Sequence, residues 1–207
     1  KQNFISGNRC ERGAGMAKNK HINLYEYKYN RLFNYYTPLT KEKAKRGTVG
    51  LPRALGMFET YPLWFTLLTE LGFRVELSAK SSKNLFFSGY NSIPSQTVCY
   101  PAKIAHGHIM DLLNKKVDSI FFPCLPKSQK EFASQEDFYN CPIVTSYPEL
   151  LSKNITEVLQ SGIPYYSPFL PLDEKILPQR LHKIKLFKRI TLKTLKQAVK
   201  KAFAEQK

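Results

Sequence analysis

The side chains best suited to chemistry in this sequence are its cysteines. Cys99 directly precedes a predicted helix, and a helix N-terminus favours a thiolate through its dipole and its free N–H groups. Cys124 follows the continuous apolar run 117–122, which is typical of a strand buried on both faces. Cys141 ends the loop that starts at Cys124 and could fold back to the same edge. The sequence therefore predicts that these three cysteines converge on one rim of the fold.

Converging thiolates suit zinc or an iron–sulfur cluster. No CxxC pair is present, however, so the spacing alone does not indicate a metal. Cysteine is also among the most buried residue types as a small hydrophobe, which leaves a purely structural role as the alternative. The cysteines are too few and too scattered for a secreted disulfide scaffold.

Four polar side chains lie where a ligand could bind. In open α/β sheets, ligands bind beyond the carboxyl ends of the strands. The residues predicted at that edge, which could hold an anion, are Arg53, Ser81, Ser82 and Lys103. Ordinary helix-end charges have the same appearance, so the alternative is a structural role for all four.

Motifs that would complete an active site are missing from this sequence. It contains no GxxxxGK[ST] or GxGxxG phosphate loop and no GxSxG nucleophile elbow. His106 and His108 lie two positions apart on a predicted helix, so they should face different directions and act as surface or core residues rather than as paired ligands. The sequence alone does not establish whether the chain is an enzyme.

The elements that must position these residues alternate along the chain. Apolar runs predict strands at 48–51, 73–77, 117–122, 143–145 and 163–169. Helical patterns separate them, with starts indicated by Ser81-Ser82, Pro101 and Pro148 and ends by Gly72, Gly89 and Gly162. The alternation predicts an α/β fold with a mainly parallel, Rossmann-like three-layer sheet of about five strands, followed by a helical C-terminal tail.

The charge distribution divides the chain into three parts. The 207 residues carry a formal net charge of +16. Residues 1–46 and 171–207 each hold 11 basic and 3 acidic side chains, which makes +8 each, whereas 47–170 hold 10 of each sign. We interpret 47–170 as the α/β domain, between a basic N-terminal segment and a basic helical tail. A balanced core lacks the basic stripe of a nucleic-acid-binding domain, so nucleic acid is not expected as a partner.

Two further features bear on localisation. No apolar stretch approaches the roughly 18 residues that a transmembrane helix needs. The first ten residues lack the apolar core of a signal peptide and the chain does not start with Met, so we expect a cytoplasmic protein and a piece of a longer chain. The basic flanks would then pack against missing parts, remain solvated, or contact an acidic partner.

Several strings of residues are familiar in combination. They are GLPRALGMFETYPLWFTLLTELGF (50–73), VCYPAKIAHGHI (98–109) and NCPIVTSYPELL (140–151), preceded by SGNRCERG (6–13). Together they resemble the uncharacterised central domain of the large activase-related proteins that are linked to 2-hydroxyacyl-CoA dehydratases.

The resemblance implies a modular parent protein. In such proteins, ATPase domains of the acetate kinase/actin type precede this domain and a dehydratase-like region often follows, so residues 1–46 would be a linker and ATP would bind only to other domains. Related activases and dehydratases hold [4Fe–4S] clusters through scattered cysteines. By that analogy, the ligand candidates are Cys99, Cys124 and Cys141, with Cys10 as a fourth.

Two functions follow from this reasoning. The leading hypothesis is an accessory or iron–sulfur-cluster-binding redox module of an ATP-dependent 2-hydroxyacyl-CoA dehydratase activase system. The alternative is a non-catalytic scaffold or ligand-binding domain for an acyl-CoA or another anion, with structural cysteines or a zinc site.

Overall fold

The computed structural model describes residues 22–130, 134 and 136–207, and the chain divides into two compact units, 1–35 and 36–207. The described part of the first unit is mainly helix α1 (Leu24–Phe33). The Asn23 side chain caps its N-terminus by accepting from the N–H of Glu26. The Arg31 guanidinium lies 3.5 Å from the centre of the Tyr35 ring.

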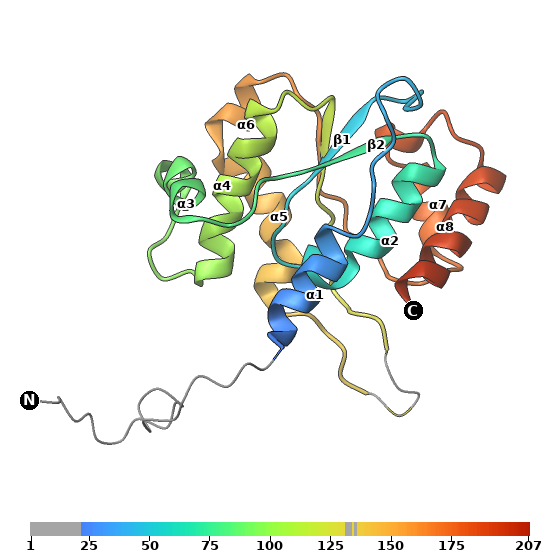
Figure 1. The fold of residues 1–207 in the computed structure, drawn as a ribbon, viewed down its shortest axis with the longest axis horizontal. Coiled ribbons are helices and arrows are strands. Elements are labelled where there is room, and N and C mark those ends of the chain that lie inside the picture. Colours follow the sequence, from blue (N-terminus) through green and yellow to red (C-terminus); the bar gives the residue numbers. More distant parts are fainter. Residues whose placement is uncertain (1–21, 131–133, 135) are drawn as a thin grey trace, which may run out of the picture. The chain divides into compact units, whose positions relative to one another are not determined.

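The second unit contains a four-stranded parallel sheet (Figure 1). Its strands are β1 (Thr48–Leu51), β2 (Arg74–Leu77), β3 (Ser119–Phe121) and β4 (Tyr165–Tyr166), in the order β2-β1-β3-β4. All three pairings are parallel, with Val49 opposite both Val75 and Ser119. The predicted α/β fold with a mainly parallel sheet is therefore confirmed.

The predicted fifth strand, 143–145, is wrong. These residues lie in helix α5 (Pro142–Asn154), which begins six residues before the predicted start at Pro148. So short a run, Ile143, Val144 and Thr145, does not distinguish a strand from one face of a helix. Pro142 occupies the first helical turn, where its missing N–H costs nothing, so it starts the helix instead of ending a loop.

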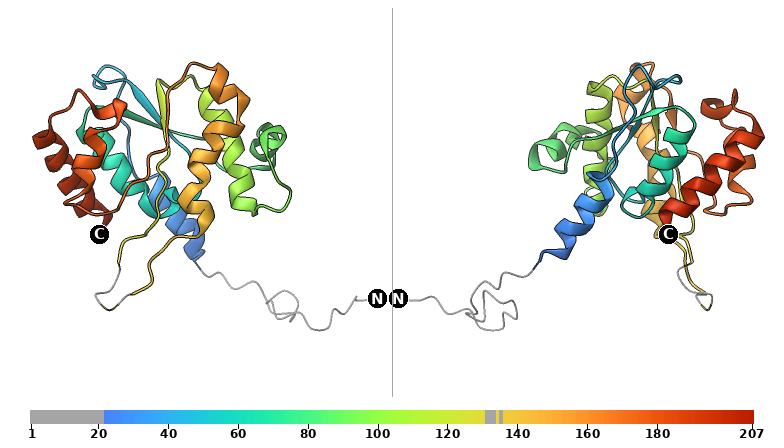
Figure 2. Two further views of the ribbon diagram at one scale, coloured as in Figure 1. Left: turned by 180° about the vertical axis from the view of Figure 1, so that it is seen from behind. Right: turned by 45° about the vertical axis from the view of Figure 1, so that its right-hand side comes forward.

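The remaining helices form two groups (Figures 1 and 2). α2 (Met57–Glu70) packs along α8 (Leu192–Gln206), which also contacts α7 (Leu177–His182). α4 (Tyr100–Asn114) contacts α3 (Lys83–Ser88), α5 and α6 (Thr156–Gln160). Short 3-10 turns cover Tyr90–Ser92 and Lys185–Phe187.

An aromatic cluster ties the C-terminal segment to the sheet. The ring of Phe121 on β3 lies 5.3 Å from that of Trp64 on α2 and 5.8 Å from that of Phe187. All three side chains are almost fully buried, and Phe73 also contacts Phe187 edge-on at 6.1 Å. The basic tail thus packs into the same core as the sheet.

Lipid-spanning segments are not seen in the described part of the chain, where every helix is too short or too polar to cross a membrane.

Candidate functional site

A large cleft opens beyond the carboxyl end of the sheet. Its volume is about 1240 Å³, and its walls include Arg53–Gly56 after β1, Leu125 after β3 and the first turns of α4 and α5. In the order β2-β1-β3-β4 the chain leaves β1 toward β2 on one side and reaches β3 on the other. Open α/β sheets bind ligands at this point, where the connections diverge. We call this space the switch-point cleft.

Two thiols line the switch-point cleft. Cys99 is the N-cap residue of α4 and Cys141 that of α5; both have extended backbones and exposed side chains. A proline follows each in the first helical turn, where no N–H is needed. Neither thiol makes a capping hydrogen bond, and each lies at the positive end of a helix dipole.

Cys124 has a different environment from these two. It is fully buried just after β3, where its N–H donates to the carbonyl of Pro168 and its carbonyl accepts from Leu170. Burial raises the pKa of its thiol to about 11. It does not line the switch-point cleft, so two of the three cysteines predicted to share a rim do so and the third is a core residue.

The described residues contain no group of three or more His, Cys, Asp or Glu side chains arranged to hold a metal ion. Cys10, the fourth predicted ligand, lies outside the described residues. The switch-point cleft therefore offers two thiol ligands from the described residues, which is half of a four-thiolate set.

The four residues predicted to bind an anion separate into two pairs. Arg53 and Ser81 line the switch-point cleft. Ser82 instead caps α3 by accepting from the N–H of Leu85, as its position before that helix predicts. The ammonium of Lys103 donates to the carbonyl of Gln96 at 2.7 Å and does not line the cleft.

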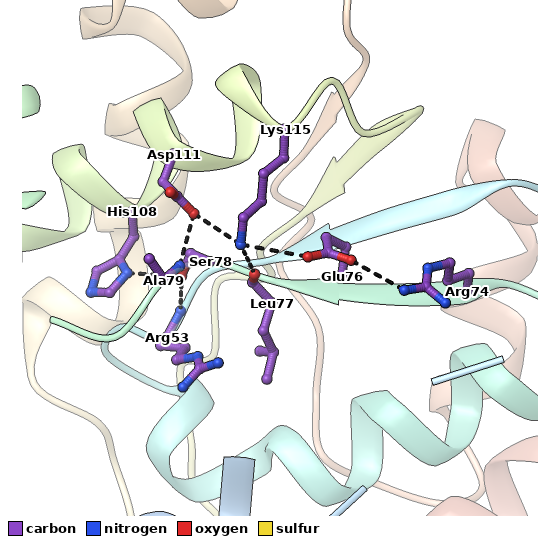
Figure 3. A network of polar contacts seen from close by, with 9 residues as sticks. All are labelled: Arg53, Arg74, Glu76, Leu77, Ser78, Ala79, His108, Asp111 and Lys115. Atoms are coloured by element: carbon purple, nitrogen blue, oxygen red, sulfur yellow. Dashed lines mark hydrogen bonds and ion pairs between the residues drawn. The ribbon is translucent and has the colours of Figure 1, made fainter. Parts of the chain in front are cut away.

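His108 connects α4 to the segment that follows β2 (Figure 3). Its Nδ1 lies 2.8 Å from the Oγ of Ser78, which accepts from the backbone N–H of Arg53 at 2.8 Å. Its Nε2 lies 3.1 Å from the Oγ of Ser81. The ring is fully buried, and this burial lowers the pKa of His108 to about 4, an effect that Asp111 opposes and Arg53 and Lys115 reinforce. The imidazole is therefore neutral at pH 7.

His106 makes an equivalent connection to α5. Its Nε2 lies 2.9 Å from the hydroxyl of Tyr147, and its Nδ1 lies 2.7 Å from the Oγ of Ser92. Because the Ser92 hydroxyl donates to the carbonyl of Gly89, it must accept from Nδ1–H, which leaves Nε2 to accept from Tyr147. Burial, and secondarily the Cys99 charge, raise the pKa of Tyr147 to about 12. Both histidines are satisfied core residues, which is one of the two roles that the sequence predicts for them.

The face of α4 that carries His108 also holds the end of β2, through the charged side chains of Asp111 and Lys115 (Figure 3). Asp111 accepts from the backbone N–H of Ala79 at 2.8 Å and pairs with Lys115 at 3.2 Å. Lys115 also donates to the carbonyl of Leu77 at 2.6 Å and lies 3.5 Å from Glu76. Sequence reasoning missed this arrangement, although the positions 108, 111 and 115 share one helix face and were a signal for it.

A family model matches residues 48–207, a range that includes the whole sheet, the described walls of the switch-point cleft and α8. Its description is the CoA enzyme activase uncharacterised domain (DUF2229). No curated protein and no solved structure matches the chain.

Proposed function

This chain belongs to the CoA enzyme activase uncharacterised domain family, and from that premise we propose that it is an accessory module of an ATP-dependent 2-hydroxyacyl-CoA dehydratase activase system. In this role the domain supplies Cys99 and Cys141 as two ligands of an iron–sulfur cluster. The cluster would provide the system with a centre for electron transfer.

The observation that carries the proposal is the matched placement of the two thiols. Both cap the N-terminus of a helix, both are exposed and both line the switch-point cleft. A metal-bound thiolate is negative, and the positive end of a helix dipole is a favourable place for it. A core cysteine such as Cys124 has neither the exposure nor the position.

The two thiols do not complete a ligand set by themselves. A [4Fe–4S] cluster is usually held by about four cysteines, so the remaining ligands come from outside the described residues. Cys10 and cysteines of the ATPase or dehydratase-like domains are the candidates. A cluster shared in this way would place the domain at an interface within the activase system.

The test is elemental analysis of protein purified and reconstituted without oxygen. Iron and acid-labile sulfide in equal amounts are expected in the wild type and in Cys124→Ser, and they should be strongly reduced in Cys99→Ser and Cys141→Ser. Cys124→Ser is the matched control because it also removes a thiol, but one in the core. Equal cluster content in all variants, or zinc in place of iron, would contradict the proposal.

Alkylation gives a second readout that needs no cluster. In folded metal-free protein, iodoacetamide should modify Cys99 and Cys141 and leave Cys124 unmodified, because Cys124 is buried and its thiol pKa is raised to about 11. Protection of Cys99 and Cys141 after reconstitution, measured by mass spectrometry, is the expected result. Unchanged alkylation of both would show that the loaded metal binds elsewhere.

A further inference from the structure

We propose that the side of the switch-point cleft formed by Arg53 and Ser81 binds the phosphate group of an organic ligand, with His108 as a positioning residue behind Ser81. The proposal uses neither Cys99 nor Cys141, so it does not rest on the proposed cluster. It is carried by the hydrogen bonds around His108, by the charges that line the cleft and by the cleft's size.

The hydroxyl of Ser78 determines which ring nitrogen of His108 carries the proton. Ser78 is fully buried, and its Oγ already accepts from the N–H of Arg53. Within the described chain, the acceptor that its own proton reaches is the Nδ1 of His108. A buried hydroxyl proton without an acceptor is costly, so Ser78 donates to Nδ1 and the neutral ring carries its proton on Nε2.

This assignment makes Ser81 a hydrogen-bond donor toward the switch-point cleft. The Nε2–H of His108 donates to the Oγ of Ser81. The Ser81 hydroxyl therefore has its own proton left to donate, and no acceptor for that proton is found among the described residues. Because Ser81 lines the cleft, the O–H can donate to a ligand oxygen there.

The same tautomer rules out a different use of this pair. A serine beside a histidine is the arrangement of an activated nucleophile, in which the ring accepts the hydroxyl proton. With the proton already on Nε2, His108 cannot accept a proton from Ser81. The geometry therefore favours binding over covalent catalysis.

The charges that line the switch-point cleft suit an anion. Its described lining contains the cations Arg53, Lys130 and Lys207 and one carboxylate, Glu59. The Arg, Lys, Asp and Glu side chains of this lining sum to +2, so the cleft without the proposed cluster should attract anions. An arginine and an oriented hydroxyl are donors that phosphate oxygens accept well.

The size of the cleft indicates that the phosphate is part of a larger molecule. Small-molecule sites are usually about 300–1,000 Å³, and the switch-point cleft is about 1240 Å³. Its walls also contain apolar side chains, including Phe58, Ile104, Leu125 and Val144. A phosphorylated organic molecule of nucleotide size would use both the charged and the apolar walls.

Isothermal titration with a matched pair of probes tests the proposal. AMP and ribose 5-phosphate should bind to the full chain, and adenosine, which lacks only the phosphate of AMP, should not. Arg53→Gln and Ser81→Ala should each weaken AMP binding about tenfold or more. Ser82→Ala and Lys103→Gln are the controls, since these side chains point to other partners, and they should leave AMP binding unchanged.

Three results would overturn the proposal: binding of adenosine as tight as that of AMP, no binding of any probe at millimolar concentration, or undiminished AMP binding by both cleft variants. The ¹⁵N shifts of the His108 ring test its positioning role separately. A protonated Nε2 and an unprotonated Nδ1 are expected at pH 7. A ring protonated on Nδ1 would remove the Ser81 donor and overturn the inference.

Discussion

The side chain of Gln206 on α8 is hydrogen-bonded to the backbone of Leu63 on α2. Its Oε1 accepts from the Leu63 N–H at 3.1 Å, and its Nε2 donates to the carbonyl of Glu59 at 2.7 Å. An uninterrupted helix pairs these two backbone groups with each other. Pro62 lies beside them, and a proline inside a helix disturbs the ladder at that turn. Gln206 therefore supports α2 at the turn where it is weakest.

Replacing Gln206 with Ala should destabilise the protein by about 1–2 kcal/mol, because two backbone groups lose a partner. Urea unfolding measures this loss. Gln206→Glu should cost at least as much, since a carboxylate cannot donate to the carbonyl of Glu59. Gln197, exposed on the same helix, provides the control, and Gln197→Ala should change stability by less than about 0.5 kcal/mol. Equal effects of the Ala variants at 206 and 197 would show that the bridge does not support α2.

Acid should weaken the fold through its buried histidines. The pKa values of His106 and His108 are about 4 in the folded protein, below the ordinary value of 6.5, because burial disfavours the charged ring. Between these values the unfolded chain binds more protons than the folded one, so stability is fully present above about pH 6.5 and is lost as the pH falls toward 4. The expected slope is at most about 1.4 kcal/mol per pH unit for each histidine.

Urea unfolding between pH 7 and pH 4.5 measures that slope, and the histidine ring resonances separate it from carboxylate titration. The rings of His106 and His108 should show no titration between pH 7 and pH 5.5. A midpoint near 6.5 for either ring would refute the assignment of a buried, neutral imidazole.

Replacing Gly107 with Ala should be strongly destabilising, although Ala is the better helix former by about 1 kcal/mol. A Cβ at Gly107 would lie 1.9 Å from the carbonyl oxygen of Leu85, and one at Gly89 would lie 2.3 Å from the backbone nitrogen of Gly107. The α3 and α4 segments thus approach closely through two glycines, and α3 must shift to admit a methyl group.

Thermal unfolding of Gly107→Ala should show a lowered midpoint. The ring shifts of His108 should also change, because its partner Ser81 lies immediately before Ser82, the N-cap residue of α3. Asn114→Ala, at an exposed position at the end of the same helix, is the control and should leave both unchanged. A Gly107→Ala protein as stable as the wild type would mean that the close approach is not required for the fold.

Elements with local signals were predictable from the sequence. Gly72 ends α2 because its φ of +84° suits a residue without a Cβ, and the N–H of Phe73 returns to the carbonyl of Leu68, as in a Schellman motif. Ser82 and Gly89 start and end α3 as predicted. These signals act within a few residues, so the start and end of a helix can be predicted from its nearest neighbours in the chain.

The cysteines show which features cannot be predicted from the local sequence. Cys99 and Cys141 were placed beside a common edge from their positions in the chain, and both line the switch-point cleft. The sequence predicts the same location for Cys124, but its side chain is buried. The orientation of a residue just after a strand depends on what packs against it. For Cys124 this is the segment that follows β4, and no local pattern specifies that contact.

The sequence by itself determined the alternation of strands and helices, the parallel sheet and the edge of the sheet at which the switch-point cleft opens, because periodicity, caps and breakers act locally. Only the tertiary structure decided which polar side chains line the switch-point cleft. Arg53, Ser81 and His108 come from segments after β1, after β2 and within α4, and they meet because the strand order brings those segments together. Ser82 and Lys103 have the same residue chemistry, but their donors and acceptors are used by the local backbone.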